Sequence, residues 1–449
     1  MRTAAPAAQP TVQLARKIGV YAATAVTVGD IVGSGIFRSP HVVAQHLASV
    51  PLMLVAWVVG GLLSICGALV MAELAVGHPR SGGLYVFLRE AFGDVAGFVF
   101  GWAHLWVIKP TLIASIATVF TLYFCQVTQL PEAAQFSVAA AAILLLTGVN
   151  WLGVTQGAWT QSLFTTIKVI GIAGLCLAAF VLPASRDPIL SNGALRVVEP
   201  AALGAFAVAM IAILFAYDGW ADSTYVAGEV INPQRTLPIA IVWGTWLVIA
   251  IYVATNAAYA HVLGAEGIAF YPAVGAETMR RVLGGWGARA LAVLVAVSTF
   301  GTTNGSVLTG SRVTQAMAAD GLMWPRLARL DPKRGTPGLA LWVQAACACA
   351  WLLAANSFED VSGWFVTTVW LFYALAPVAL FARRRRERAG TVAAAAYRTP
   401  FYPLTPAIFG IATVLIIAND LHSSGWRAAA GLMISALGFP IYYVWKRRG

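Results

Sequence analysis

The sequence predicts an all-α integral membrane protein with twelve transmembrane helices. Of its 449 residues, 59% are hydrophobic and only 10% are charged, whereas a soluble domain carries about 25% charged residues. The mean hydropathy is +0.76. Apolar runs of about twenty residues, enough to cross a hydrocarbon core of roughly 30 Å, recur along the whole chain. This pattern excludes a soluble globular protein.

The twelve predicted spans follow one another closely, and no connection between them is long enough for a separate soluble domain. They are residues 17–38, 48–72, 94–124, 136–155, 162–184, 203–227, 237–262, 287–317, 337–356, 360–382, 402–420 and 427–446. The first residues, MRTAAPAAQPTVQLARK, lack a short apolar core with a cleavage site, so we expect no removable signal peptide.

The basic residues are distributed unevenly between the two sides of the membrane. An even number of spans places both termini on one side, and that side holds about twenty Lys and Arg residues against about seven on the other. We therefore expect cytoplasmic termini in the cytoplasmic (inner) membrane. The net charge of +11 sets this orientation and does not indicate a nucleic-acid partner. For the run RRRRER (383–388), contact with membrane lipid headgroups stays open as an alternative.

Two spans carry glycines and an acidic residue within apolar sequence. GDIVGSGIF (29–37) interrupts the first span, and FAYDGWADSTYVAGE (215–229) interrupts the sixth. These are the first members of two five-helix sets, and an odd number of helices makes the second set insert upside down relative to the first. A pair of interrupted helices at equivalent positions of two inverted halves is typical of the central site of a transporter.

The physical properties of glycine explain what such an interruption does. Glycine adopts backbone angles that end a helix, and unwound backbone within a membrane persists only where it lines a cavity or is buried in protein. Free N–H groups there bind a carboxylate and free carbonyls bind an ammonium, which are the two groups of an amino acid. Close packing of helices on small residues is the alternative explanation.

Several sequence blocks carry a more specific resemblance. They are GSGIF (33–37), the block from FAYDGW to INPQRTLPIAI (215–241), NGSVLTGSR (304–312) and ADGLMW (319–324), and PEAAQFSVAAAAILLLTGVN (131–150) fits as well. From about residue 17 to 382, the chain resembles the amino acid–polyamine–organocation superfamily. Within it, the sequence is most similar to the L-type amino acid transporters and their bacterial relatives.

This resemblance implies two inverted five-helix repeats plus two extra helices, with alternating access to a site in the middle of the membrane. The expected parts are an N-terminal cytoplasmic tail (1–16), the two repeats (17–184 and 203–382), a cytoplasmic basic loop (383–401) and the last two helices (402–446). The resemblance implies an amino acid substrate and neither a cofactor nor a metal.

The resemblance also implies which residues contact the substrate. On helix 1, those that would meet its carboxylate through backbone N–H groups and the Ser34 hydroxyl are Ile31, Val32, Gly33, Ser34 and Gly35. On helix 6, those that would supply carbonyls to its ammonium are Phe215, Ala216, Asp218 and Gly219, with Phe215 also an aromatic gate. Ser306 on helix 8 would touch the substrate side chain.

Lys168 stands in the middle of the fifth span, in QSLFTTIKVIGIAG (161–174). Burying an unpaired ammonium costs several kcal/mol, so an intramembrane lysine is a functional candidate. In sodium-independent members of the superfamily, a lysine at this position takes the place of a sodium ion. Lys168 would accordingly brace helices 1 and 8 or carry a proton; a salt bridge without a role in transport is the alternative.

Two acids depart from the pattern of the family. Asp30 replaces the small or neutral polar residue expected just before the helix-1 break, and Asp218 lies within the helix-6 break. They are candidates to attract a cationic substrate group, to carry a coupled proton or to cap a half-helix. Lys109, followed by Pro110 in the third span, marks a span edge, a kink or a further buried charge, and the sequence leaves it unassigned.

Animal members of the group form a disulfide to a heavy-chain partner from the loop between spans 3 and 4. The corresponding position here is Thr128, and Cys125 is offset from it by three residues. We therefore expect no disulfide-linked heavy chain, and the oligomeric state stays open.

The leading functional prediction is a sodium-independent secondary transporter of neutral L-amino acids, working by exchange or with proton coupling. A cationic amino acid or polyamine transporter is the alternative, because of Asp30 and Asp218. An integral-membrane enzyme is disfavoured, since no histidines stand at ligand spacing: they are His41, His46, His78, His104, His261 and His422. A P-loop for an ATP-driven pump and a channel filter loop are also absent from the sequence.

Overall fold

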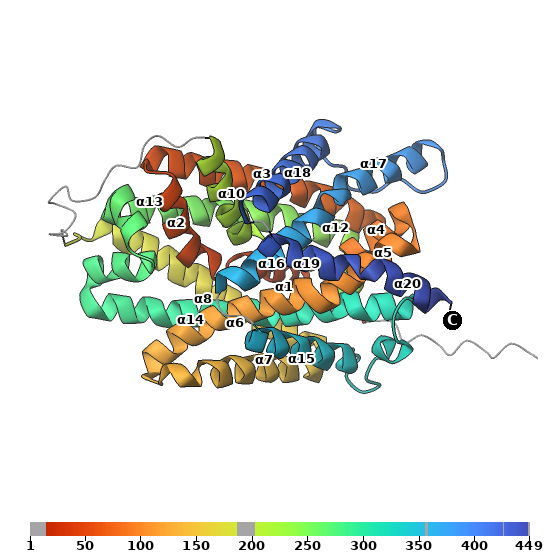
Figure 1. Cartoon of the computed structure of the whole chain (residues 1–449), viewed down its shortest axis with the longest axis horizontal. Coiled ribbons are helices and arrows are strands. Elements are labelled where there is room, and N and C mark those ends of the chain that lie inside the picture. Colours follow the sequence, from red (N-terminus) through yellow and green to blue (C-terminus); the bar gives the residue numbers. More distant parts are fainter. Residues whose placement is uncertain (1–14, 186–202, 355–357, 425, 448–449) are drawn as a thin grey trace, which may run out of the picture.

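A computed structural model describes residues 15–185, 203–354, 358–424 and 426–447 (Figure 1). The predicted cytoplasmic tail falls almost entirely outside these residues, as does the connection between the two predicted repeats. Within the described parts every named element is helical, and a single isolated bridge pairs Ile18 with Val230. The protein is therefore all-α, as the hydropathy pattern predicts.

The helices follow the apolar segments of the sequence. They are α1 (Val20–Ile31), α2 (Gly35–His46), α3 (Val50–Gly77), α4 (Leu84–Phe92), α5 (Asp94–Ala103), α6 (Lys109–Thr128), α7 (Gln135–Leu152), α8 (Val154–Val181), α10 (Leu203–Tyr217), α11 (Asp222–Tyr225), α12 (Pro233–Pro238), α13 (Gly244–Phe270), α14 (Val274–Ala319), α15 (Gly338–Ala354), α16 (Phe358–Tyr373), α17 (Leu375–Arg388), α18 (Leu404–Ser424), α19 (Trp426–Ala436) and α20 (Gly438–Lys446). Two π-helical turns, η1 (His104–Ile108) and η4 (Ile239–Trp243), precede α6 and α13, and short 3-10 turns are η2 (Glu132–Ala134), η3 (Ala227–Glu229) and η5 (Pro325–Ala328).

Among the described residues, eight helical segments are long and apolar enough to cross a membrane. They are Val20–His46, Val50–Gly77, Asp94–Thr128, Glu132–Leu152, Val154–Val181, Pro233–Phe270, Val274–Ala319 and Gly363–Arg388. Shorter apolar helices lie at Gly204–Tyr217, Gly338–Ala354 and Leu404–Asn419. The full count of twelve spans and their division into two inverted repeats stay predictions.

Several helices extend beyond the predicted spans because hydropathy does not register where the backbone turns. The first predicted span stops at residue 38, whereas α2 continues to His46 through Pro40. The eighth is predicted over 287–317, whereas α14 begins at Val274 and bends at Gly284, whose φ is 69°. A glycine is suited to this bend because it has no Cβ to clash in the left-handed region.

The long helix α14 organises the packing around the centre of the protein. It packs against α6 and α8 and also contacts α1 (Figure 1). The short helices α7 and α15 lie side by side at one edge, where they cover α6 and α14. The broken helix formed by α1 and α2 is thereby enclosed by α8, α10, α13 and α14.

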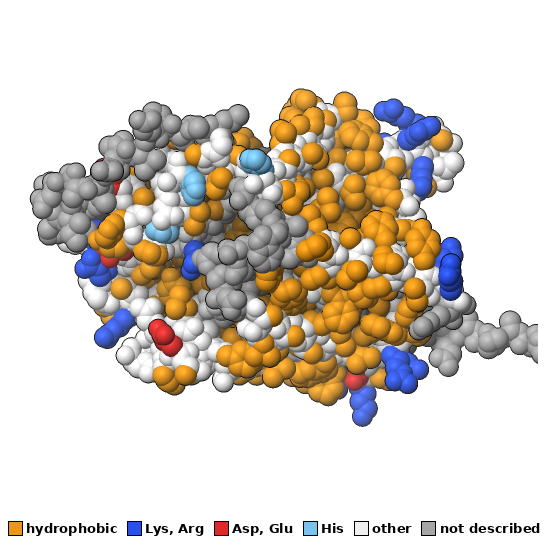
Figure 2. Space-filling model, viewed as in Figure 1, with side chains coloured by type: hydrophobic (Ala, Val, Ile, Leu, Met, Phe, Trp, Pro, Cys, Tyr) orange, Lys and Arg blue, Asp and Glu red, His pale blue; other side chains and the backbone are white. Residues whose placement is uncertain are grey.

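The surface suits a lipid environment. Large apolar side chains stand exposed on the outer helices, including Trp243 (67%), Ile170 (66%) and Leu145 (61%), whereas monomeric soluble proteins rarely expose large contiguous apolar patches. Figure 2 shows Lys and Arg side chains at the end of the molecule where α17 and α20 end, while the opposite end carries both acidic and basic side chains.

Candidate functional site

Both glycine-containing segments interrupt their helices. The first helix ends at Ile31, bends through Val32, Gly33 and Ser34, and resumes as α2 at Gly35. The second ends at Tyr217 and resumes as the single turn α11. The start of a helix leaves its first N–H groups without partners in the same helix, so the first turn of α2 points free donors at the break.

The two breaks touch one another through their backbones. Gly219 has a φ of +119°, and a Cβ added there would lie 2.7 Å from the carbonyl carbon of Asp30 and from the nitrogen of Ile31. A Cβ on Gly35 would lie 2.5 Å from the Cα of Ala216. This close contact between the two backbones therefore requires glycine at both positions. The glycines of the two interrupted segments thus allow the broken helices to touch.

A tyrosine hydroxyl lies within hydrogen-bond distance of both breaks. The buried Tyr252 on α13 lies 2.8 Å from the carbonyl oxygen of Ile31 and 3.0 Å from that of Ala216. A hydroxyl has one proton to donate, so Tyr252 satisfies one of these carbonyls at a time. The other carbonyl keeps an acceptor position for a different donor.

The fully buried ammonium of Lys168 binds the backbone of the helix-1 break. Its Nζ donates to the carbonyl oxygens of Gly29 (2.8 Å) and Val32 (2.7 Å) and to the Oγ1 of Thr302 (2.9 Å). These acceptors are uncharged, so the geometry does not match the salt bridge considered as an alternative. Lys168 links α8 to α1, and Thr302 adds a link to α14.

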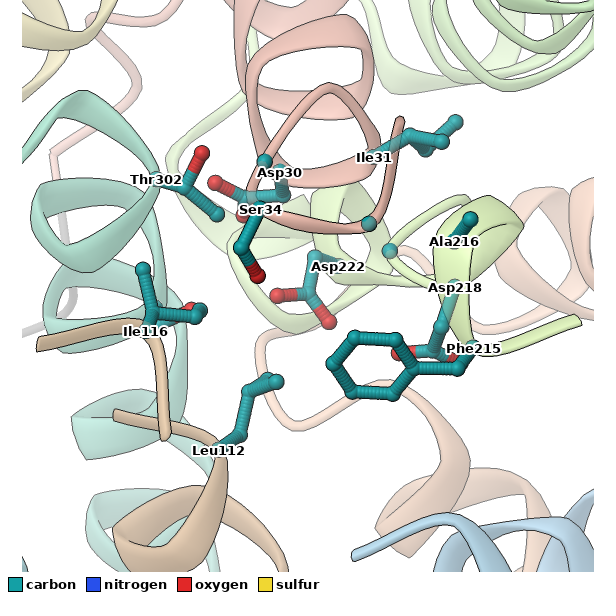
Figure 3. Close-up of a pocket in the computed structure, with 14 residues that line it drawn as sticks. Asp30, Ile31, Ser34, Leu112, Ile116, Phe215, Ala216, Asp218, Asp222 and Thr302 are labelled. Carbon is teal, nitrogen blue, oxygen red and sulfur yellow. The ribbon is translucent and has the colours of Figure 1, made fainter. Parts of the chain in front are cut away.

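A cavity of about 20 Å³ lies where the breaks meet (Figure 3). Ten of the twelve predicted site residues line it, and these are Asp30, Ile31, Gly33, Ser34, Gly35, Phe215, Ala216, Asp218, Gly219 and Ser306. Val32 and Lys168 are outside the lining: the Val32 N–H donates to the carbonyl of Val28 (2.8 Å) and the Val32 carbonyl accepts from Lys168. A cavity of this volume holds little more than a water molecule, so in this conformation it has no room for a larger ligand.

Sequence reasoning missed four residues of this lining, namely Leu112, Ile116, Asp222 and Thr302. Figure 3 shows the Asp222 carboxylate between Ser34 and the ring of Phe215. Asp222 stands four residues after Asp218 within residues 215–229, and this spacing was the available signal. Leu112 and Ile116 are ordinary apolar residues of α6, and nothing in their sequence context distinguishes them from core residues.

Three carboxylates therefore face the cavity, and their partners differ. One oxygen of Asp30 accepts a hydrogen bond from Gln161 (3.0 Å). Its other oxygen is buried and has no hydrogen-bond partner among the described residues, and the same holds for one oxygen of Asp218. Asp222 forms an ion pair with Lys109 and accepts a hydrogen bond from Thr309 (3.0 Å). The lysine left unassigned from sequence is thus buried and paired next to the cavity.

Comparison with known proteins gives the family. The profile described as amino acid permease matches residues 18–437, which covers both helix breaks, Lys168 and the cavity-lining residues. The chain belongs to the amino acid permease family. It is thereby a member of the amino acid–polyamine–organocation superfamily, as the sequence blocks indicate.

Known transporters are similar to this permease over most or nearly all of its length. The serine/threonine exchanger SteT of Bacillus subtilis (strain 168) is 31% identical over 438 residues, which cover 97% of this chain and 98% of SteT. The human b(0,+)-type amino acid transporter 1 is 33% identical over 388 residues, covering 84% of this chain and 79% of the relative. Human large neutral amino acids transporter small subunit 2 is 31% identical, with coverages of 96% and 81%. The family and these relatives are transporters rather than enzymes.

A second buried ion pair holds the permease together beyond the helix-6 break. Arg312 on α14 and Glu229 on η3 are 0% and 1% exposed in their side chains, and the Arg312 Nε lies 2.8 Å from the Glu229 Oε1. The carbonyl of Glu229 also accepts hydrogen bonds from the backbone N–H groups of Lys17 and Ile18. The chain just before α1 is therefore attached to the end of the other broken helix.

Proposed function

We propose that this permease is a sodium-independent secondary transporter of L-amino acids, and that neutral amino acids are its substrates. The observation that carries the proposal is the Lys168 ammonium, which donates to two carbonyls of the helix-1 break. A cation fixed at these oxygens stabilises the unwound backbone, which is the task a sodium ion would otherwise perform. Transport then proceeds by exchange or with proton coupling, through alternating access.

The substrate is bound mainly by backbone. Its carboxylate meets the N–H groups at the start of α2 and the Ser34 hydroxyl, since helix N-termini attract anions. Its ammonium meets the carbonyl at the end of α10 that Tyr252 leaves free. Phe215 and Ser306, which line the cavity, contact the substrate side chain. The closed cavity requires the broken helices to move against α6, α8 and α14 during each cycle.

Counterflow in proteoliposomes tests this function. The purified protein is reconstituted, the vesicles are loaded with one unlabelled L-amino acid at a time in sodium-free buffer, and uptake of the same labelled amino acid is followed. We expect accumulation with neutral amino acids, unchanged when sodium is added. Folded protein that shows no counterflow with any amino acid would contradict the proposal.

A second candidate is a transporter of cationic amino acids or polyamines. It is favoured by two buried carboxylate oxygens beside the cavity, one on Asp30 and one on Asp218, for which the residues that the structure describes offer no hydrogen-bond partner. An unpaired buried carboxylate is costly unless a cation or proton reaches it. Counterflow with arginine, ornithine or putrescine, and not with neutral amino acids, would favour this candidate.

We further propose that the protein works in the cytoplasmic membrane, with both ends in the cytoplasm, and without a disulfide-linked heavy chain. Thr128 stands at the position where a linking cysteine is expected, and Cys125 is a buried free thiol. Native membranes run on reducing and non-reducing gels give the test. A thiol-sensitive species of higher mass would contradict the proposed absence of a covalent partner.

A further inference from the structure

The ion pair between Lys109 and Asp222 joins three helices beside the cavity. Lys109 begins α6 directly after the π-helical turn η1, and Asp222 begins α11. The side chains are 2% and 5% exposed. The Thr309 hydroxyl of α14 donates to the same Asp222 oxygen that Lys109 contacts. Asp222 lines the cavity and Lys109 does not, so Lys109 acts on the cavity through the carboxylate.

The surroundings of Lys109 are built to hold an ammonium at this point. A Cβ on Gly310 would lie 2.9 Å from the Lys109 Cγ, so the glycine makes room for the aliphatic stem. The Lys109 Nζ lies 5.5 Å from the ring centre of Tyr225, an arrangement that favours a cation. The ammonium is thus directed to Asp222 by packing and by charge.

The formal charges next to the cavity show what this pair does. Asp30, Asp218 and Asp222 all line the cavity, and within the described part of the chain only Asp222 has a lysine in ion-pair contact. The Lys168 ammonium is bound to backbone carbonyls and the Thr302 hydroxyl. Without Lys109, a third carboxylate would face the substrate without a cationic partner, and the site would attract cations more strongly.

We propose that Lys109 is a specificity-determining residue, which sets the charge preference of the substrate site by keeping Asp222 in an ion pair. This inference rests on the proposed amino acid substrate. Because the interaction of buried charges is strong at short range, removal of one partner changes the preference between charged and neutral substrates by about tenfold or more. Removal of both partners together restores the original balance of charge.

The test compares L-arginine with L-citrulline, a neutral molecule of nearly the same size and shape. Their apparent Kd values are measured from ligand-induced rises in the melting temperature of the purified protein. Lys109→Met should shift the ratio of the two constants toward arginine by about tenfold, and Asp222→Asn should shift it toward citrulline. Lys109→Arg keeps the charge and should keep the ratio, as should the double variant Lys109→Met with Asp222→Asn.

The outcomes separate this inference from the proposed function. If the single variants keep the wild-type ratio while their melting temperatures fall, the pair only stabilises the fold and the inference is overturned. Wild-type protein could bind neither ligand while counterflow identifies another amino acid as the substrate. In that case Lys109→Met is expected to bind arginine. A Lys109→Met protein that does not bind arginine would also overturn the inference. If no amino acid supports counterflow or binding, it is the proposed function that fails. Should Lys109→Met not fold, an unchanged ratio in Asp222→Asn decides against the inference.

Discussion

Replacement of Lys168 by alanine should abolish transport while leaving the protein folded. The substitution removes three hydrogen bonds from a fully buried ammonium, two of them to the carbonyls of Gly29 and Val32. The Thr302 hydroxyl lies 3.0 Å from the first carbonyl and 3.1 Å from the second, and Ser298 lies 3.2 Å from the second. Both carbonyls therefore keep a neutral donor in the variant.

These contacts give the expected magnitude. A hydrogen bond to a charged group contributes about 1.5–3 kcal/mol, so the two bonds to the break contribute at least about 3 kcal/mol to its geometry. If the substrate binds only that geometry, the loss corresponds to about a hundredfold in affinity. The unfolding free energy changes less, because the variant no longer buries an ammonium, whose desolvation costs several kcal/mol.

Counterflow rate and melting temperature in detergent are measured on the same preparations. Ile170→Ala is the matched control, because Ile170 lies on the same helix two residues further and its side chain is 66% exposed. We expect the control to transport at the wild-type rate. A Lys168→Ala protein with full counterflow would refute the reasoning, since the break would then keep its geometry without the ammonium.

Three further predictions concern other contacts. Gly219→Ala should abolish transport, because φ is +119° and the new Cβ would meet the backbone of the helix-1 break; counterflow measures this. Glu229→Gln leaves the Arg312 guanidinium buried without its carboxylate, so the protein should lose about 3–5 kcal/mol of stability and melt at lower temperature. His78 directly follows α3, and its pKa is lowered mainly by burial and further by the neighbouring Arg383. The unfolded chain then binds a proton that the folded protein does not, so stability should fall as the pH drops from about 7 to about 5, and less so in His78→Asn.

Matched controls separate these effects from general damage. Gly148→Ala changes a helical glycine with open space around it and should leave transport intact; equal activity of Gly219→Ala would contradict the close backbone approach. Glu132→Gln removes an exposed acid and should not change the melting temperature; the same result for Glu229→Gln would show that Arg312 needs no charged partner. If His78→Asn leaves the slope of melting temperature against pH unchanged, this histidine does not contribute to the pH dependence of stability.

The sequence by itself determined that the chain is all-helical and crosses a membrane, and it indicated the place of the candidate site. Apolar runs indicate membrane-crossing helices, because lipid requires that a backbone satisfy its own hydrogen bonds, and eight described helical segments are long and apolar enough to cross. The glycines of GDIVGSGIF and the acid-glycine pair Asp218-Gly219 are local exceptions to that requirement, and ten of the twelve predicted site residues line one cavity as a result. Lys168 could be chosen from sequence because an ammonium within a span is costly.

Only the tertiary structure decided which groups these residues meet. Lys109 and Asp222 are 113 positions apart, and nothing local to either residue indicates that they form a pair. Val32 lies within a predicted binding segment, but its carbonyl faces Lys168 rather than the cavity. The physical reason is that an ion pair or a hydrogen bond depends on distances between helices. Hydropathy and helix-breaking residues describe each helix alone, whereas packing on α14 sets those distances.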